Sequence, residues 1–342
     1  KADSDTSAFI VSDPKVHTEI IESASHDYTI NLGGTVDMDN TTTRGYPSYE
    51  VAFQPNISLE IYNVGTTPVI DPWIVINDVR DWRNIDSIVA EATSGAVDEQ
   101  DRLMLLYEFA RSHRYHDNPL FPGDEMHDPV KHFNSYCAGF CDDIGRVTCA
   151  LAYRAGFTKD HHGGDPVIRS MHGHVMSEVA VNGRYQFIDT DENAFYLDPE
   201  NERPVSGDEI VRDSDLAARD YTYGPLFRSW DNIEKAPALL GRDDEKGRSI
   251  TIGHELHLTL RPGEKLTLRW DNIGKTPGPK TLKHFANSFL DYEPELDENT
   301  SNYARYSQGI IARDGALAGI TSDAFITFAV ESPYVICGGA VS

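Results

Sequence analysis

A cysteine, a histidine and an aspartate in the middle of the chain have the residue types of a thiol catalytic triad. Cys141 and His174 lie 33 positions apart (174 − 141), and His174 and Asp189 lie 15 apart (189 − 174). In such a triad the sulfur attacks a carbonyl carbon, the imidazole accepts the thiol proton, and the carboxylate holds the imidazole in the required tautomer. These residues are our candidates for the nucleophile, the base and the orienting acid.

The segment that begins at the candidate nucleophile has the apolar spacing of a helix. Within residues 141–155, Ile144, Val147 and Leu151 mark one stripe, and Gly156 stands where a left-handed helix cap belongs. A helix N-terminus offers free N–H groups and partial positive charge, which stabilise a thiolate and a developing oxyanion. The pattern therefore places the thiol where its chemistry is favoured.

The histidine and the aspartate fall on two predicted strands, at residues 174–181 and 184–189. The strands are joined by Asn182-Gly183, a strong signal for a two-residue hairpin turn. Paired positions in this hairpin sum to 365, which puts His174 opposite position 191. Asp189 is then a diagonal neighbour on the same face, within reach of the imidazole.

The motifs around these residues resemble the transglutaminase-like (papain-like) superfamily. GFCDD at 139–143 and LAYRAGF at 151–157 are similar to its nucleophile helix, HVMSEV at 174–179 to its histidine strand, and YQFID at 185–189 to its aspartate strand. The resemblance covers roughly residues 98 to 200 and points to a bacterial branch with flanking β domains. It implies that Cys141, His174 and Asp189 form a triad that cleaves or exchanges an amide bond.

Two features depart from the superfamily pattern. Met176 stands where the family often has an aromatic residue. Asp142 and Asp143 place negative charge directly beside the thiol, which opposes the effect of the helix dipole on a thiolate.

Four further residues are candidates for substrate binding. Asn134 and Tyr136 precede the nucleophile, His172 shares a strand face with His174, and Tyr185 precedes the candidate acid on its strand. Among the other cysteines, Cys149 is expected in the core.

Two metal interpretations compete with the triad. The His172-x-His174 pair is also a metal-ligand arrangement, with further ligands available from His113, His116, His161 or His162. Residues 189–193 resemble the start of a calcium loop but lack its glycine and distant glutamate. We predict no metal and no cofactor.

The periodicity predicts an α+β fold with three parts. We expect a β-sandwich-like domain at residues 1–82, a transglutaminase-like core at 83–240, and a second β-sandwich-like domain at 241–342. Period-two alternation predicts strands at 28–36, 49–62, 73–79, 252–260, 265–270 and 324–330, and helical spacing predicts helices at 84–93 and 98–112.

The charge of the chain limits its partners. The 55 acidic and 30 basic residues give a formal charge of −25, which disfavours nucleic acid because its binding depends on lysine and arginine contacts to phosphates. No segment approaches the ~18 consecutive apolar residues of a membrane span. The chain begins without methionine or a hydrophobic signal region, so we expect a processed, secreted or periplasmic protein that acts on a polymeric substrate, either protein or polysaccharide.

Three functions are open from the sequence. The first is a thiol-dependent acyl-transfer enzyme that uses the triad. The second is a polysaccharide lyase that acts on a uronic-acid polymer, with His174 or a tyrosine as proton abstractor. The third is a non-catalytic binding module on a degenerate core.

Overall fold

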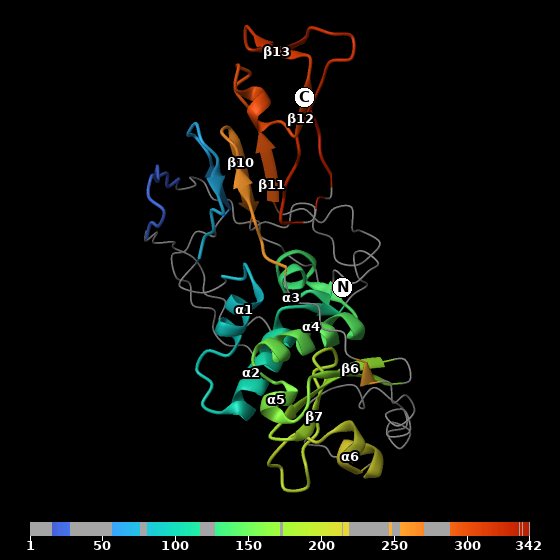
Figure 1. Cartoon of the computed structure of the whole chain (residues 1–342). Coiled ribbons are helices and arrows are strands. Elements are labelled where there is room, and N and C mark those ends of the chain that lie inside the picture. Colours follow the sequence, from blue (N-terminus) through green and yellow to red (C-terminus); the bar gives the residue numbers. More distant parts are fainter. Residues whose placement is uncertain are drawn as a thin grey trace, which may run out of the picture.

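The computed structural model shows a mixed α+β architecture with several small antiparallel sheets (Figure 1). It describes residues 16–27, 57–75, 81–116, 127–171, 174–213, 215–218, 246–247, 254–269, 288–334, 336 and 338–341. The strand predicted at 28–36 lies outside these residues, as does His172. Within the described ranges, no helix combines the length and the apolar character that crossing a membrane requires.

Two helices precede Cys141, and each begins at a side-chain cap. α1 spans Ile85–Ala92 and α2 spans Glu99–Ser112. The Asn84 side chain accepts a hydrogen bond from the Ser87 N–H, and the Asp98 side chain accepts one of 2.7 Å from the Asp101 N–H. Such caps satisfy N–H groups that have no partner inside a helix. Both predicted helices are confirmed.

The central helix α4, Cys141–Arg154, is buried along most of its length. It contacts α1 and α2 as well as strand β6, so helices cover one side and a sheet the other (Figure 1). Gly145 faces the sheet, and a Cβ at this position would be in ordinary contact with it, 3.7 Å from the Met176 backbone. The helix ends as predicted, with Gly156 at a φ of +99°.

The hairpin that carries the histidine and the aspartate has the predicted register. β6 spans His174–Val181 and β7 spans Arg184–Ile188. Val181 pairs with Arg184, and the turn residues Asn182 and Gly183 have φ angles of +52° and +78°, as a type I′ turn requires. The hairpin belongs to an antiparallel sheet in the order β7-β6-β5-β8, where β5 spans Val167–Met171 and β8 spans Lys246–Gly247.

A second sheet joins segments from the two ends of the chain. β1 (Ser58–Tyr62) pairs with β10 (Glu264–Arg269), which in turn pairs with β11 (Ser288–Tyr292). The buried leucines Leu258, Leu260 and Leu266 form the small core beside it. One strand of our predicted N-terminal domain thus shares a sheet with two strands of the predicted C-terminal domain. The domain boundaries and the sandwich architecture stay predictions.

The other predicted strands are shorter in the structure or absent from its described part. Residues 73–75 are not in a strand, and the segments predicted at 252–260 and 324–330 contain the short strands β9 (Thr259–Leu260) and β15 (Phe325–Thr327). The remaining elements are β2 (Val69–Ile70), β3 (Tyr115–His116), α3 (Pro129–Lys131), the π-helix η2 (His132–Tyr136), β4 (Ala138–Gly139), α5 (Lys159–His162), α6 (Gly207–Arg212), α7 (Asp215–Ala218), the 3₁₀-helix η5 (Thr300–Tyr303), β12 (Tyr306–Gln308), β13 (Ile310–Arg313) and β14 (Ala316–Gly319).

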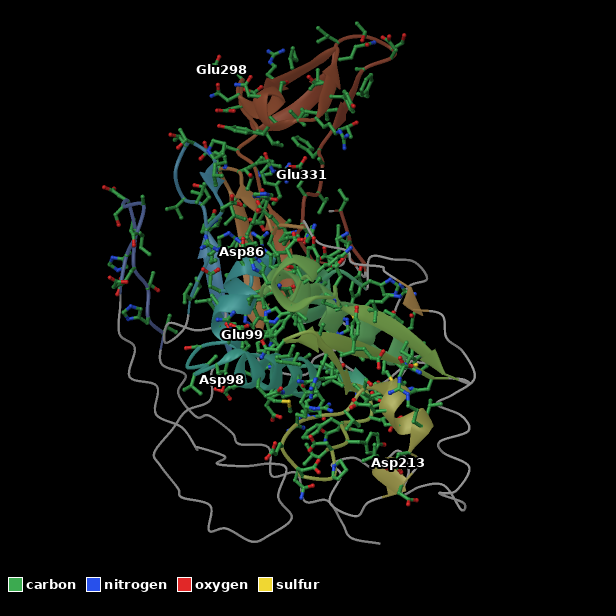
Figure 2. All side chains as sticks on the ribbon, turned by 60° about the horizontal axis from the view of Figure 1, so that its bottom comes forward. Asp86, Asp98, Glu99, Asp213, Glu298 and Glu331 are labelled. Carbon is green, nitrogen blue, oxygen red and sulfur yellow. The ribbon has the colours of Figure 1, made fainter. Side chains whose placement is uncertain are left out.

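Acidic side chains lie on several parts of the molecule (Figure 2). Asp86 and Asp98 belong to the helical region, Asp213 follows α6, and Glu298 and Glu331 lie in the C-terminal β region. The negative charge therefore does not come from one acidic segment.

Candidate active site

Cys141 is the first residue of α4 and lies partly exposed at its N-terminus. The strand before it, β4, pairs in parallel with β3, and this pairing places His116 beside Gly139. Gly139 leaves room for Asp143, because a Cβ at position 139 would lie 2.7 Å from the Asp143 Cβ. The thiol is thus positioned by the helix start and by the segment that follows α2.

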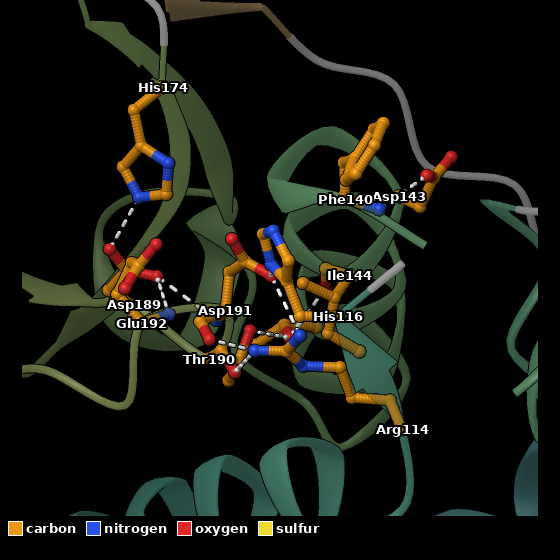
Figure 3. Close-up of polar contacts among 11 residues, drawn as sticks. Arg114, His116, Phe140, Asp143, Ile144, His174, Asp189, Thr190, Asp191 and Glu192 are labelled. Atoms are coloured by element: carbon orange, nitrogen blue, oxygen red, sulfur yellow. Dashed lines mark hydrogen bonds and ion pairs between the residues drawn. The ribbon is translucent and has the colours of Figure 1, made fainter. Parts of the chain in front are cut away.

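His174 and Asp189 form a direct contact. The Nε2 atom of His174 lies 2.6 Å from Oδ2 of Asp189, which is fully buried (Figure 3). A ring nitrogen of His174 lies within 4.8 Å of the Cys141 sulfur. Because Nε2 is bound to Asp189, Nδ1 is the nitrogen that remains for the thiol. The structure therefore brings the three sequence-predicted triad residues together.

The surroundings of His174 favour its protonated form. Burial by itself lowers the pKa of the imidazole, but the hydrogen bond to Asp189 and the neighbouring Cys141 raise it, with a net value of about 10. An imidazolium beside a sulfur stabilises negative charge on that sulfur. The geometry and the charge together suit a thiolate–imidazolium pair.

The Asp189 carboxylate is fixed on its other side by backbone groups. Its Oδ1 atom accepts hydrogen bonds of 3.0 Å from the N–H groups of Asp191 and Glu192. Asp189 and Ala194 also exchange two backbone hydrogen bonds, which close the loop between them. The two N–H donors and the imidazole contact both carboxylate oxygens, which fixes the carboxylate in the orientation that holds His174.

A second buried carboxylate, Asp191, lies in the same site. Its Oδ1 atom is 2.8 Å from Nη1 of Arg114 and 2.8 Å from Nδ1 of His116 (Figure 3). The Arg114 guanidinium also donates to the backbone carbonyls of Thr190 and Asp191. The segment after α2 therefore pins the loop that follows β7, and it places a cation beside Asp191.

The acidic pair next to Cys141, Asp142 and Asp143, is in contact with positively charged groups. Asp142 contacts Arg146 at 2.8 Å, and the buried His127 lies 3.5 Å from Asp142 and 3.3 Å from Asp143. Asp143 also accepts the Phe140 N–H at 2.9 Å. Burial lowers the pKa of His127, but the two carboxylates raise it to about 9. The negative charge that we expected to oppose the thiolate is therefore paired with cations.

Three of the four candidate substrate-binding residues, Asn134, Tyr136 and Tyr185, lie in the described part of the chain. The Asn134 side chain donates to the carbonyls of Trp82 and Val130, and Tyr136 is buried. Tyr185 donates to the Asp165 carbonyl and lines a separate groove near the hairpin turn. Tyr185 and Asp189 are four positions apart (189 − 185), which corresponds to about 13 Å of extended chain.

The structure distinguishes core residues from possible site residues among the other cysteines and histidines. Cys149 is in the core as expected, and burial raises the pKa of its thiol to about 12. His113 packs among aromatic rings with Trp82 and Phe109, and His162 is buried against Phe157. Among the described candidates for further metal ligands, only His116 reaches the site.

Sequence reasoning missed three residues that shape the site. Asp191 was available as a signal, because the hairpin register puts position 191 opposite His174. Arg114 and His127 gave no signal. Arg114 contacts Asp191, 77 positions away (191 − 114), and His127 contacts Asp142, 15 positions away (142 − 127), and no local pattern connects either pair.

No protein-family model, curated protein or solved structure matches the chain.

Proposed function

We propose that this protein is a thiol-dependent acyl-transfer enzyme with a transglutaminase-like core and a Cys141–His174–Asp189 triad. The observation that carries the proposal is the 2.6 Å contact between His174 and Asp189, with the Cys141 sulfur at a helix start within 4.8 Å of the same imidazole. Nucleophile, base and orienting acid stand in the order that acyl transfer requires.

The proposed reaction uses these groups in two steps. The Cys141 thiolate attacks the carbonyl carbon of an amide or ester, and free N–H groups of the first turn of α4 stabilise the oxyanion. His174 then donates its proton to the leaving group, and a thioester forms on the sulfur. Water or an amine, deprotonated by His174, attacks the thioester and regenerates the thiolate.

The charges near the site favour acyl transfer over a lyase reaction on a uronic-acid polymer. Asp189, Asp191 and Glu192 lie around His174, and burial together with the two aspartates raises the pKa of Glu192. Arg114, the nearby arginine, already pairs with Asp191. A polyanionic substrate would therefore meet negative charge at the proton abstractor, where the described arginine beside the site is already paired.

A chromogenic ester tests the proposal before a natural substrate is known. With p-nitrophenyl acetate we expect a burst of p-nitrophenolate and an acetyl group on Cys141, located by peptide mass spectrometry. Added hydroxylamine should capture the acyl group as a hydroxamate. The Cys141→Ala variant should give neither the burst nor the adduct, and an unchanged burst in this variant would refute the proposal.

A further inference from the structure

The triad nucleophile has a second carboxylate within reach. One oxygen of Asp191, the sulfur of Cys141 and a ring nitrogen of His174 all lie within 4.8 Å of one another. The three side chains come from the start of α4, from β6, and from the loop after β7. Thiolate, imidazole and carboxylate are the donor types that zinc prefers in proteins.

One oxygen of the Asp191 carboxylate is available to bind a ligand. Its side chain is only 2% exposed, and its Oδ1 atom receives both Arg114 and His116. Its Oδ2 atom accepts no hydrogen bond from the part of the chain that the structure describes. A buried carboxylate oxygen without a partner is costly, so a cation that binds it gains free energy.

The spacing of the donors suits a tetrahedral ion. Zinc bonds of about 2.0–2.3 Å place neighbouring donor atoms roughly 3.3–3.8 Å apart, which falls within the 4.8 Å that bounds this group. Three protein ligands leave a fourth position open for water. Calcium and magnesium are excluded by the sulfur, since both prefer oxygen ligands.

The neighbours of the ligands also have the arrangement found around zinc sites. A metal-bound histidine usually donates its other ring N–H to a carboxylate, as His174 does to Asp189. Arg114 and His116 orient Asp191 in the same way. The Arg114 cation also reduces the negative charge at the site, so binding should be weaker than in a structural zinc site and reversible.

We propose that Cys141, His174 and Asp191 bind a zinc ion, which occupies the thiol and imidazole and blocks acyl transfer. On binding, the proton on Nδ1 of His174 is released to solvent, and the Cys141 thiolate and Nδ1 donate their electron pairs to the metal. Metal binding stands without the proposed function, whereas inhibition rests on it.

Co²⁺ serves as a substitute for Zn²⁺ that can be followed by visible absorption spectroscopy. The chelator-treated full-length protein is titrated with Co²⁺, and we expect tetrahedral d–d bands and a thiolate-to-cobalt charge-transfer band that Zn²⁺ abolishes. Cys141→Ser should remove the charge-transfer band, and Asp191→Asn should weaken Zn²⁺ binding at least about tenfold. Glu192→Gln is the matched control, because it belongs to the neighbouring His116–Asp191–Glu192 group, and it should change the affinity less than about fivefold.

The outcomes separate the metal site from the catalytic proposal. A wild-type protein without the charge-transfer band, or a band that survives Cys141→Ser, overturns the site. Alkylation of wild-type Cys141 by iodoacetamide gives a readout that needs no variant: Zn²⁺ should slow it, and an unchanged rate contradicts the proposal. A cobalt band in a protein that is never acylated leaves the metal site and refutes the acyl-transfer function, whereas acylation that Zn²⁺ does not inhibit refutes the regulatory role.

Discussion

Two acidic groups flank Cys141, one on its own helix and one on the loop after β7. The helix pair, Asp142 and Asp143, contacts His127 and Arg146 and caps the helix start. The loop pair, Asp189 and Asp191, is buried and contacts His174 and Arg114. The residue types are the same, yet the first pair is neutralised within its own segment of the fold, while the second faces the reactive groups.

Aspartates of the same charge therefore differ in exposure and in partners on the two sides of Cys141. Asp142 is close to half exposed and shares its charge with two cations, so its effect on the sulfur is screened. Asp189 has no exposed surface and contacts the imidazole of His174 directly. Burial and partner, more than distance along the chain, distinguish the aspartate that contacts the imidazole from the one that does not.

The largest difference between the two acidic pairs should appear in the acylation rate when one carboxylate of each pair is replaced by an amide. In Asp189→Asn, the amide oxygen must keep the two backbone N–H donors, so its NH₂ group faces Nε2 of His174. The imidazole then carries its proton on Nδ1, toward the sulfur, and cannot accept one. We expect acylation by p-nitrophenyl acetate to fall by about 10³- to 10⁴-fold.

The matched change on the helix side is Asp143→Asn. Its amide oxygen can still accept the Phe140 N–H, so acylation should fall by less than about tenfold. Equal losses in the two variants, measured as single-turnover rates, would remove the distinction between the two groups.

The arginines of the two groups should differ in their contribution to stability. The Arg114 side chain is 6% exposed beside Asp191, whereas that of Arg146 is 25% exposed beside Asp142. Arg114→Gln leaves a buried carboxylate poorly compensated and should lower the free energy of unfolding by about 3 kcal/mol. Arg146→Gln should lower it by less than about 1 kcal/mol. Denaturant unfolding measures both, and a larger loss in Arg146→Gln would contradict the comparison.

A methyl group at Gly139 should disturb the helix-side pair by sterics alone. The new Cβ would lie 2.8 Å from Asp143 Oδ2, the atom that caps Phe140. We expect Gly139→Ala to cost about 1–3 kcal/mol of stability. Gly338→Ala is the control, since a Cβ added there would have no atom of the described residues within 4 Å; a change there should stay within about 0.5 kcal/mol.

The smallest effect should depend on pH and should belong to His127. Its pKa in the folded protein, about 9, is above the ordinary value of 6.5, so its charge stabilises the fold fully below pH 6.5 and ceases to do so as the pH rises through about 9. His127→Gln should therefore be less stable than wild type by about 1 kcal/mol at pH 6. Thermal unfolding between pH 6 and 10 measures this difference, and a gap that persists at pH 10 would disprove the assignment.

The sequence predicted the parts of the site that local patterns control. Hairpin register follows from the Asn182-Gly183 turn, and it placed Asp189 beside His174 because a two-residue turn leaves no freedom in pairing. The course of α4 follows from its apolar stripe, and its end follows from Gly156. These features depend on residues within a few turns or one hairpin of each other.

Contacts between distant segments were not predictable in the same way. Arg114 reaches Asp191 because β3 and β4 pair over 23 positions (138 − 115), and two-residue strands carry no periodic signal. The ion pair between Arg169 on β5 and Glu178 on β6 is another example. Charged residues in a strand predict a solvent-exposed face, but both side chains are buried here, and Arg169 also contacts Asp208 of α6. The joining of β1 to β10 likewise depends on pairing across about 200 residues.

The most direct test of the central claim is the alkylation rate of Cys141 at pH 7, resolved by peptide mass spectrometry. In folded wild-type protein, iodoacetamide should label Cys141 about 10²-fold faster than in His174→Ala, because the imidazolium no longer stabilises the thiolate in the variant. The buried Cys149 should stay unlabelled in both proteins and so report that each is folded. Equal labelling of Cys141 in the two folded proteins would contradict a working thiol–imidazole pair.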